Sequence, residues 1–516
     1  MLILVNISTI SAGEIENILT SDVIHMESAN ENQISVTPEQ DLKQIINDSN
    51  VNDIIILEPG IYKVHNITIT KNITLQGNGN TRDIIIDGEN KSSIFLIRSP
   101  AVYATFKNIT FINGLTNSFG GAISMETGNV YVDYCHFINN TALMSTNAGA
   151  ISNYGDAENK GYLFVNNSLF INNHADHDGG AVTTCYANSD IYNSVFINNS
   201  ARRDGGAIRV SVEGYGNVQD CIFMYNYAKE WGGAYYSWAG TSNIVKCIFL
   251  NNTGGTNGGA VMVSGNLNLT KSIIVNNTGK ETGGSFYIQQ PMFDRTTVIN
   301  VQNNLITNNT SPYGKEIYIK WKDTKHLFTQ FDDNDWGDED PNDSSVIDPN
   351  NVTARSKVSS TIKSDLLNEL DMNLLSRYTD LIDHYFPDGY LDEYKKQDNT
   401  PTADDNENAS NQGFNPNKNS NLSSNNQNNN QYNIISNNTQ SSNTATNSSQ
   451  NLKDLISSKN IVIGNSTSAG ENKNAFELNK KDSVAKQASS NIEYFLALAI
   501  VVFLALVLGY RAKNKE

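Results

Sequence analysis

The chain has 516 residues, with 36 basic and 54 acidic side chains, which gives a formal net charge of −18 at pH 7. Nucleic-acid binding requires basic patches that neutralise phosphates, so this balance argues against a nucleic-acid partner. The four cysteines include no Cys-x-x-Cys pair, which argues against a zinc or dithiol redox centre.

The first residues resemble the end of a signal peptide. Residues 1–5 are apolar and residues 8–12 are a small-residue run of the kind that precedes cleavage, so 1–12 is interpreted as a signal-peptide-like remnant. The basic segment of a signal peptide is missing, and we therefore expect a start codon further upstream.

Residues 35–50 predict a capping helix. Leu42, Ile45 and Ile46 share one helical face, Thr37 is a suitable N-cap, and Pro38 suits the first helical position. A cap is expected because the open end of a stacked fold exposes unpaired backbone and core.

Two short phrases then alternate along the chain. The first is a variant of Gly-Gly-Ala followed by an apolar residue, and its second glycine recurs every 25 to 31 residues, at 121, 149, 180, 206, 233, 259 and 284. The second phrase is a variant of Phe-x-Asn-Asn. Aromatic and β-branched residues favour strands, and Gly and Asn favour turns, so each unit is expected to hold at least two strands.

The period selects the architecture. A helical repeat is excluded because the units lack 3.6-residue apolar spacing and each glycine would cost about 1 kcal/mol in a helix. A propeller blade needs about 40 residues. The units fit coils of a parallel β-helix, which stack at about 4.8 Å and align equivalent residues in ladders. The prediction is an all-β solenoid over residues 51–350, with ladders formed by Phe137, Phe170, Phe196, Phe223, Phe249, Asn140, Asn173, Asn199 and Asn252.

Three cysteines share one position in the repeat. Cys135, Cys221 and Cys247 each lie two residues before the second phrase, so they should face inward with its aromatic residue. Cys221 and Cys247 fall in adjacent coils, where a disulfide is an open alternative, although stacked parallel side chains are poorly aimed for that bond. Cys185 lies outside this column.

The two phrases resemble the repeats of the polymorphic outer-membrane (Pmp-like) adhesins, and they look even more like those of adhesin-like β-helix proteins on the surface of methanogenic archaea. The likeness covers residues 35–345, and Asp335-Trp336-Gly337 is similar to the closing turn of such proteins. The resemblance implies a right-handed parallel β-helix and a role in adhesion to glycans or other cells. No cofactor is expected.

The segment between the second phrase and the glycines carries charge in consecutive coils. Strand spacing brings these residues within about 5–10 Å of one another. Such a ridge is either a solvated face, a binding face, a pair of catalytic carboxylates for glycoside cleavage, or a Ca²⁺ site. The candidate binding ridge consists of His174, Asp176, His177, Asp178, Arg202, Arg203, Asp204, Lys229, Glu230 and Trp231.

Two further clusters are weaker candidates. Trp231, Tyr235, Tyr236 and Trp238 form either a sugar-stacking platform or core packing. An acidic loop near the end of the repeats is either solvated or a Ca²⁺ site, although its spacing lacks the final Glu of an EF-hand. Its candidate ligands are Asp333, Asp335 and Asp338.

The remaining chain predicts a membrane-anchored stalk. The expected segments are a helical segment at 351–398, which caps the last coil or stands separately, a disordered Asn/Ser-rich stalk at 399–490, a transmembrane helix at 492–510 and a basic cytoplasmic tail at 511–516. Glycosylation sequons occur in the stalk and on the repeat turns, where ladder formation alone also accounts for the Asn.

Together these features predict a single-pass cell-surface protein that presents a rigid β-helix for adhesion. The alternatives are a membrane-tethered polysaccharide lyase or hydrolase that uses the ridge, and a passive cell-envelope spacer. We expect binding without catalysis, because no motif of a known pectin-degrading family is recognised in the chain.

Overall fold

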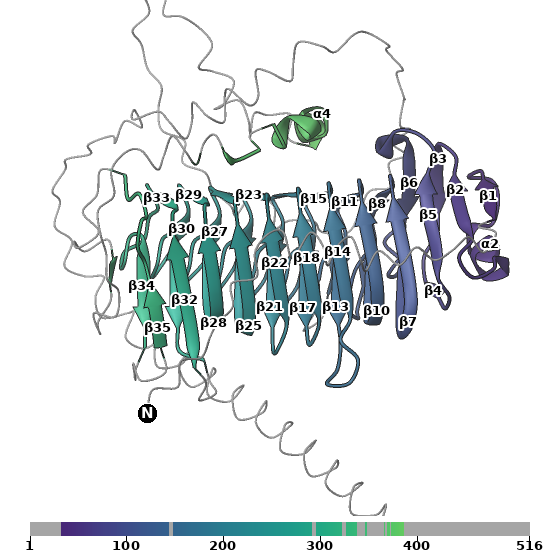
Figure 1. Ribbon diagram of the computed structural model, residues 1–516. Coiled ribbons are helices and arrows are strands. Elements are labelled where there is room, and N and C mark those ends of the chain that lie inside the picture. Colours follow the sequence, from purple (N-terminus) through teal and green to yellow (C-terminus); the bar gives the residue numbers. More distant parts are fainter. Residues whose placement is uncertain are drawn as a thin grey trace, which may run out of the picture. The chain divides into compact units, whose positions relative to one another are not determined.

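The structure is a computed structural model (Figure 1). All of the residues it describes belong to the first of two compact units, Met1–Ser457. The described residues are 32–143, 148–291, 296–321, 327–337, 346–347, 366, 369–371 and 373–385.

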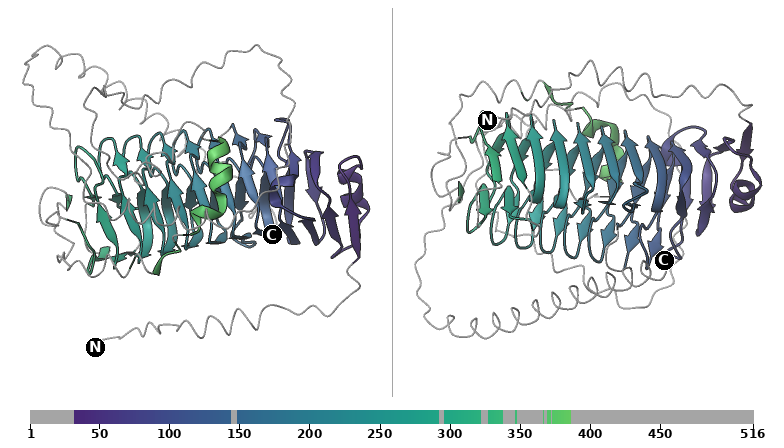
Figure 2. Two further views of the ribbon diagram at one scale, coloured as in Figure 1. Left: turned by 90° about the horizontal axis from the view of Figure 1, so that it is seen from above. Right: turned by 60° about the horizontal axis from the view of Figure 1, so that its bottom comes forward.

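The described chain winds into stacked coils whose strands pair in parallel, which confirms the predicted β-helix-like solenoid (Figures 1 and 2). Its right-handed sense stays a prediction. One coil runs through β17 (Val182–Cys185), β18 (Asn188–Tyr192), β19 (Val195–Ile197) and β20 (Ser200–Ala201). Each of these strands pairs with its equivalent in the next coil, 26 or 27 residues later.

The strands form three sheets, here called A, B and C. Besides β17 and β18, sheet A contains β1 (Gln33–Val36), β2 (Ile54–Leu57), β4 (Ile67–Ile69), β5 (Ile73–Gly77), β7 (Phe95–Lys107), β10 (Ile123–Asp133), β13 (Ile151–Tyr154), β14 (Tyr162–Asn166), β21 (Ile208–Ser211), β22 (Tyr215–Gln219), β25 (Tyr235–Val245), β28 (Val261–Thr270), β31 (Phe286–Gln289), β32 (Thr297–Gln302), β34 (Ile317–Lys320), β35 (Leu327–Gln330) and β36 (Val346–Ile347).

Sheets B and C are narrower, with strands of two to four residues. Besides β19, sheet B contains β3 (Gly60–Lys63), β6 (Ile84–Asp87), β8 (Thr110–Ile112), β11 (His136–Ile138), β15 (Leu169–Ile171), β23 (Ile222–Met224), β26 (Ile248–Leu250), β29 (Ile273–Val275) and β33 (Leu305–Thr307). Besides β20, sheet C contains β9 (Leu115–Thr116), β12 (Thr141–Ala142), β16 (His174–Ala175), β24 (Tyr227–Ala228), β27 (Thr253–Gly254) and β30 (Thr278–Gly279).

The corners between sheets use residues with left-handed backbone. In one coil, Asn193 (φ +46°) turns the chain from sheet A to sheet B, Asn198 (φ +53°) turns it to sheet C, and Gly205 (φ +65°) precedes the return to sheet A. Gly and Asn adopt this conformation most readily. The first Asn and the first Gly of the repeat phrases are therefore explained by the corners.

The core is built from ladders, as predicted. Phe196 lies between Phe170 and Phe223, with ring centroids 4.6 and 4.9 Å away and interplanar angles of 4° and 9°. The second Asn of each phrase is buried, and its side-chain amide donates to the equivalent Asn of the next coil. Asn173 Nδ2 to Asn199 Oδ1 is 2.9 Å and Asn199 Nδ2 to Asn226 Oδ1 is 3.0 Å. These hydrogen bonds give partners to amide groups that are buried in the core and cannot reach water.

The cysteines are buried and free. Cys135, Cys221 and Cys247 face the core as predicted, and no disulfide joins Cys221 to Cys247. Burial raises the pKa of the Cys135 thiol to about 12, so it packs as a small apolar group.

The N-terminal cap differs from its prediction. Its helix α2 (Leu42–Asp48) buries Leu42 and Ile46, but the N-cap is Asp41, whose carboxylate accepts from the Gln44 amide at 3.0 Å. The prediction of Thr37 as N-cap and Pro38 as first helical residue is wrong, because the residues from Thr37 form a turn closed by Gln40 N–H to Thr37 O at 3.1 Å. A short η1 (Thr81–Asp83) follows further along.

The predicted helical segment at 351–398 is described only within residues 366–385, and this part lies against the side of the solenoid rather than on the last coil or apart from it. Its described residues include η3 (Leu375–Tyr378) and α4 (Thr379–Tyr385), and their apolar side chains pack against the outer face of sheet B. We call residues 366, 369–371 and 373–385 the strap.

Several predicted segments lie outside the described residues. They are the signal-peptide-like remnant at 1–12, the stalk at 399–490, the transmembrane segment at 492–510 and the tail at 511–516. Among the helices that the structure describes, none is long and apolar enough to cross a membrane.

Candidate functional site

The candidate ridge forms where the chain turns from sheet C back to sheet A. In each coil a two-residue strand of sheet C is followed by a few turn residues and then by the glycine pair. Asp178, Asp204 and Trp231 occupy equivalent positions in three consecutive coils and pair in parallel. The ladder register therefore brings the charged turns together as predicted, coil on coil.

The ridge has an outer row that meets solvent. The Arg202 side chain is 62% exposed, and Lys229 is also exposed. His174 and Asp176 are partly exposed, with His174 Nε2 3.3 Å from Asp176 Oδ1. Arg202 reaches back to the same carboxylate at 3.4 Å. Such surface pairs contribute little to stability, so these side chains are free to exchange partners.

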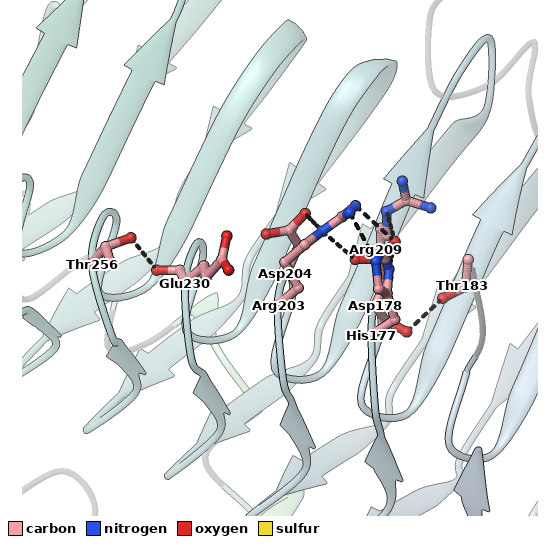
Figure 3. Close-up of polar contacts among 8 residues, drawn as sticks. All are labelled: His177, Asp178, Thr183, Arg203, Asp204, Arg209, Glu230 and Thr256. Atoms are coloured by element: carbon pink, nitrogen blue, oxygen red, sulfur yellow. Dashed lines mark hydrogen bonds and ion pairs between the residues drawn. The ribbon is translucent and has the colours of Figure 1, made fainter. Parts of the chain in front are cut away.

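Beneath this row lies a buried charge cluster, which we define as His177, Asp178, Arg203, Asp204 and Arg209 (Figure 3). The Asp178 and Asp204 side chains are both 0% exposed. Sequence reasoning placed these carboxylates on an outward turn, but the turn folds over them. Burying two carboxylates is costly unless cations accompany them.

Asp178 is the centre of the cluster. Its carboxylate lies 3.1 Å from Arg203 Nε, 3.2 Å from Arg209 Nε and 3.0 Å from His177 Nδ1. Burial alone would raise the pKa of Asp178, but Arg209, His177 and Arg203 outweigh it and hold the pKa below its ordinary value. Asp178 is therefore a fixed negative charge.

Asp204 has one close cation, Arg203, whose Nε lies 2.8 Å from Asp204 Oδ2. Burial and the neighbouring charge of Asp178 raise the pKa of Asp204 above its ordinary value, against the pull of the arginines. Arg203 is thereby shared between two carboxylates, and its Nη1 lies 2.9 Å from His177 Nε2. The cluster thus holds Arg203 and His177, both partly exposed, in fixed positions at the rim.

Arg209 was not identified from the sequence. It lies in the middle of β21, between the inward residues Ile208 and Val210, and the strand alternation turns it outward. It is nevertheless only 4% exposed. The available signal was a charged residue at a strand position that carries Tyr236 and Met262 in the following coils.

The aromatic residues near this corner divide between the two faces. Tyr235 is in the core, where its hydroxyl bonds Ser242 Oγ at 2.9 Å. Tyr236 is on the outer face with Trp231, whose ring centroid lies 6.1 Å away, and Trp238 packs in the same cluster. Because Tyr236 is only 3% exposed, Trp231 and Trp238, which are partly buried, are the two of the four predicted aromatic residues that offer a stacking surface.

The acidic loop shows no metal arrangement among the residues that the structure describes. Asp335 is buried and its carboxylate accepts from the Gly337 amide at 2.9 Å, a local turn, while Asp333 is an exposed corner residue with φ +56°. Asp338 lies outside the described residues. No group of three or more His, Cys, Asp or Glu side chains within the described ranges is arranged to hold a metal ion.

The cluster has one feature of an acid–base centre, because two neighbouring carboxylates have pKa values displaced in opposite directions. Both are enclosed and tied to arginines, however. The part of the site that a large ligand can touch is the outer row with the rims of Arg203, His177 and Trp231. Glu230 is also partly exposed, and its backbone carbonyl accepts from Thr256 Oγ1 at 2.8 Å (Figure 3).

The comparisons with known proteins concern the repeat and the fold. A family model described as the Chlamydia polymorphic membrane protein repeat matches residues 193–211, which run from the corner before β19 through the ridge to the end of β21. No curated protein matches the chain.

Among solved structures, the PL6 family alginate lyase AlyGC is 13% identical, with a TM-score of 0.30 and coverage of 63% of this chain and 53% of that one. A PL6 polysaccharide lyase from Pseudopedobacter saltans is 12% identical, with a TM-score of 0.28 and coverage of 64% and 98%. The chain thus spans about half the length of AlyGC. At these identities and TM-scores, the two structures say nothing of this chain's activity.

Proposed function

We propose that this chain is a cell-surface adhesin-like protein whose β-helix presents the ridge to glycans or to other cells. The observation that carries the proposal is the two-layer ridge: an exposed outer row that includes Arg202 and Lys229, above a buried charge cluster that fixes its base. The repeat match to polymorphic membrane proteins at 193–211 supports the surface role. Ladders that repeat in every coil give the ridge the rigidity that many weak contacts need in order to add.

Surface attachment in this proposal depends on the segments at 399–490 and 492–510, which remain predictions from the sequence. Glycosylation of the sequons on the repeat turns also remains a prediction, and so does the similarity to surface proteins of methanogenic archaea. No cofactor is part of the proposal.

The test is a glycan-array screen of the full chain in detergent, with product analysis of every polysaccharide that binds. Arg202→Ala and Lys229→Ala remove exposed charges without touching the buried cluster, so the fold should persist. Lys107→Ala is the matched control, because Lys107 is an exposed lysine in β7, outside the ridge. We expect intact bound glycan, with binding weakened by the two ridge variants and unchanged by the control.

A membrane-tethered polysaccharide lyase or hydrolase is the second candidate, and the opposed pKa values of Asp178 and Asp204 are the observation in its favour. Cleavage products that disappear in Asp204→Asn would establish it in place of the adhesin. If no glycan on the array binds, the passive cell-envelope spacer is the function that remains.

A further inference from the structure

The outer face of sheet B is apolar, unlike the exposed face of an ordinary solenoid sheet. Each three-residue strand points its central residue, Phe in most coils, into the core, and both flanking residues point outward. In β15, β19, β23, β26 and β29 all of these flanking residues are aliphatic or Met, and they are at most 6% exposed. Strands that are apolar at every position are buried on both faces.

The strap covers this face. Its buried side chains are spaced by three, four or one residues, so they line one side of a largely helical segment. They are Leu366, Leu370, Leu374, Leu375, Tyr378 and Ile382, each at most 7% exposed.

Polar contacts fix the direction of the strap. Glu369 Oε2 lies 3.0 Å from the Nζ of Lys271, the residue that follows β28. Tyr378 donates to the carbonyl of Asn167 at 2.8 Å, just after β14, and its ring packs edge-on against His136 at 5.8 Å. The strap therefore runs back along the solenoid, from later coils to earlier ones.

The chain before the strap is longer than this docking needs. Ile347 in β36 lies three coils beyond β28, which is about 14 Å along the solenoid axis. Its register partner in β28 is Met262, near the start of the strand, whereas Lys271 follows the end of the strand. Along the strand direction, Ile347 and Lys271 are therefore separated by about 30 Å. The 18 residues between Ile347 and Leu366 reach about 60 Å when extended. This length also suffices to place the strap on a second molecule.

If the strap leaves it, the outer face of sheet B is too small for two copies to pair through it directly. Seven strands of three residues, β11 to β33, present roughly 300 Å², whereas a stable interface buries about 800 Å² on each partner. Reciprocal exchange of straps restores every contact of the closed molecule in both copies.

We propose that the outer face of sheet B is an interaction surface for the strap of a second copy of this chain, so that two molecules exchange straps. The contacts are the same in the closed and exchanged forms, and concentration decides between them. A short connection holds two segments at an effective concentration of about millimolar, so single molecules are closed in dilute solution and exchange at high local density. This proposal does not depend on the ligand of the ridge.

The first test shortens the connection. Deleting residues 349–364 from the full chain leaves two residues, about 10 Å, which cannot reach the face of the same molecule. In detergent at about 10 µM, light scattering should show a dimer. Replacing the same residues with a Gly/Ser segment of equal length should leave a monomer. A shortened chain that stays monomeric, with a strap that proteases cut, would overturn the proposal.

Crosslinking locates the strap. One tagged chain carries Lys271→Cys, and a second chain carries Glu369→Cys. A short bis-maleimide joins the two chains only when the strap of the second lies on sheet B of the first. The native cysteines are buried and should not react. We expect chain-to-chain products in the shortened pair, and in the full-length pair as concentration rises from about 1 µM to about 1 mM. If the shortened chain does not fold, the full-length series decides. No such product, while Lys271→Cys/Glu369→Cys in one chain crosslinks internally, would refute exchange.

Discussion

Arg209 and Asp178 form an ion pair between neighbouring coils, with Arg209 Nε 3.2 Å from Asp178 Oδ2 and side chains only 5% and 0% exposed. The pair links β21 to the turn of the preceding coil and closes the floor of the ridge. Burial opposes charge on Arg209, but the carboxylate of Asp178 raises its pKa above the ordinary value, so the guanidinium stays charged.

The first prediction concerns this pair. Arg209→Met should lower the free energy of unfolding by about 3–5 kcal/mol, because it leaves Asp178 buried with less compensation. Arg202→Ala, in the same coil but 62% exposed, should change it by less than about 1 kcal/mol. Urea unfolding followed by circular dichroism measures both. Equal effects would mean that the buried cluster is not what holds the ridge.

The second prediction concerns pH. Burial and the charge of Asp178 raise the folded-state pKa of Asp204 to about 8, whereas the unfolded value is near 4, so between these values the folded state holds a proton that the unfolded state has lost. Stability therefore falls as pH rises from about 4 to about 8, and the loss levels off above that range. Asp178 has a lowered pKa, so its stabilising contribution is lost only when pH falls below the ordinary carboxyl range.

Asp204→Asn isolates this dependence. Urea midpoints of the parent chain and the variant should diverge with rising pH between 5 and 8, with the variant gaining relative stability. A constant difference across that range would show that Asp204 titrates normally.

The third prediction concerns the amide ladder. Asn199 accepts from both nitrogens of Asn173, at 3.1 and 2.9 Å, and donates to Asn226. Asn199→Ala leaves buried groups on both sides without partners, so the free energy of unfolding should fall by at least about 2 kcal/mol. Asn198→Gly changes a corner residue with φ +53°, which glycine accepts, and should cost less than about 1 kcal/mol. Similar losses in the two variants would contradict a special role for the ladder.

The fourth prediction concerns the second glycine of the repeat. A Cβ at Gly206 would collide with the carbonyl oxygen of Gly233 in the next coil and approach the backbone of Tyr227 within 2.7 Å. Because these atoms belong to stacked backbone, Gly206→Ala should separate the coils and lower the melting temperature markedly. In the same coil, Glu213 has φ +55°, so Glu213→Gly should leave the melting temperature unchanged or raise it slightly. Tolerance of Gly206→Ala would indicate looser stacking than the structure shows.

Residues that repeat at the same position in every coil were predictable, because each of them makes its contacts with copies of itself. The Phe stack, the Asn ladder and the inward column of Cys135, Cys221 and Cys247 followed from the period and the strand alternation alone. The cap was predicted as an element but not in detail. Thr37 and Asp41 are both acceptable N-caps, and the turn that occupies Thr37 decided between them.

Residues that occur once were not predictable in this way. Arg209 and Asp178 are 31 residues apart, and their pairing depends on an outward strand position facing the turn of another coil. The state of the two carboxyl groups depended on the same packing, since an Asp in a turn is normally solvated. Here arginines offset the cost of enclosing Asp178, whereas Asp204 keeps a raised pKa.

The sequence by itself therefore determined the solenoid, its period and the ladders of its core, because coil stacking is a local rule applied repeatedly. The tertiary structure decided that Asp178 and Asp204 lie beneath the ridge rather than on it, and that the strap lies on sheet B rather than on the last coil. The first outcome depends on side chains that differ from coil to coil at one repeat position, and the second on packing between the repeats and a segment outside them. The strap follows the apolar columns because its own apolar side chains and those of sheet B are removed from water together.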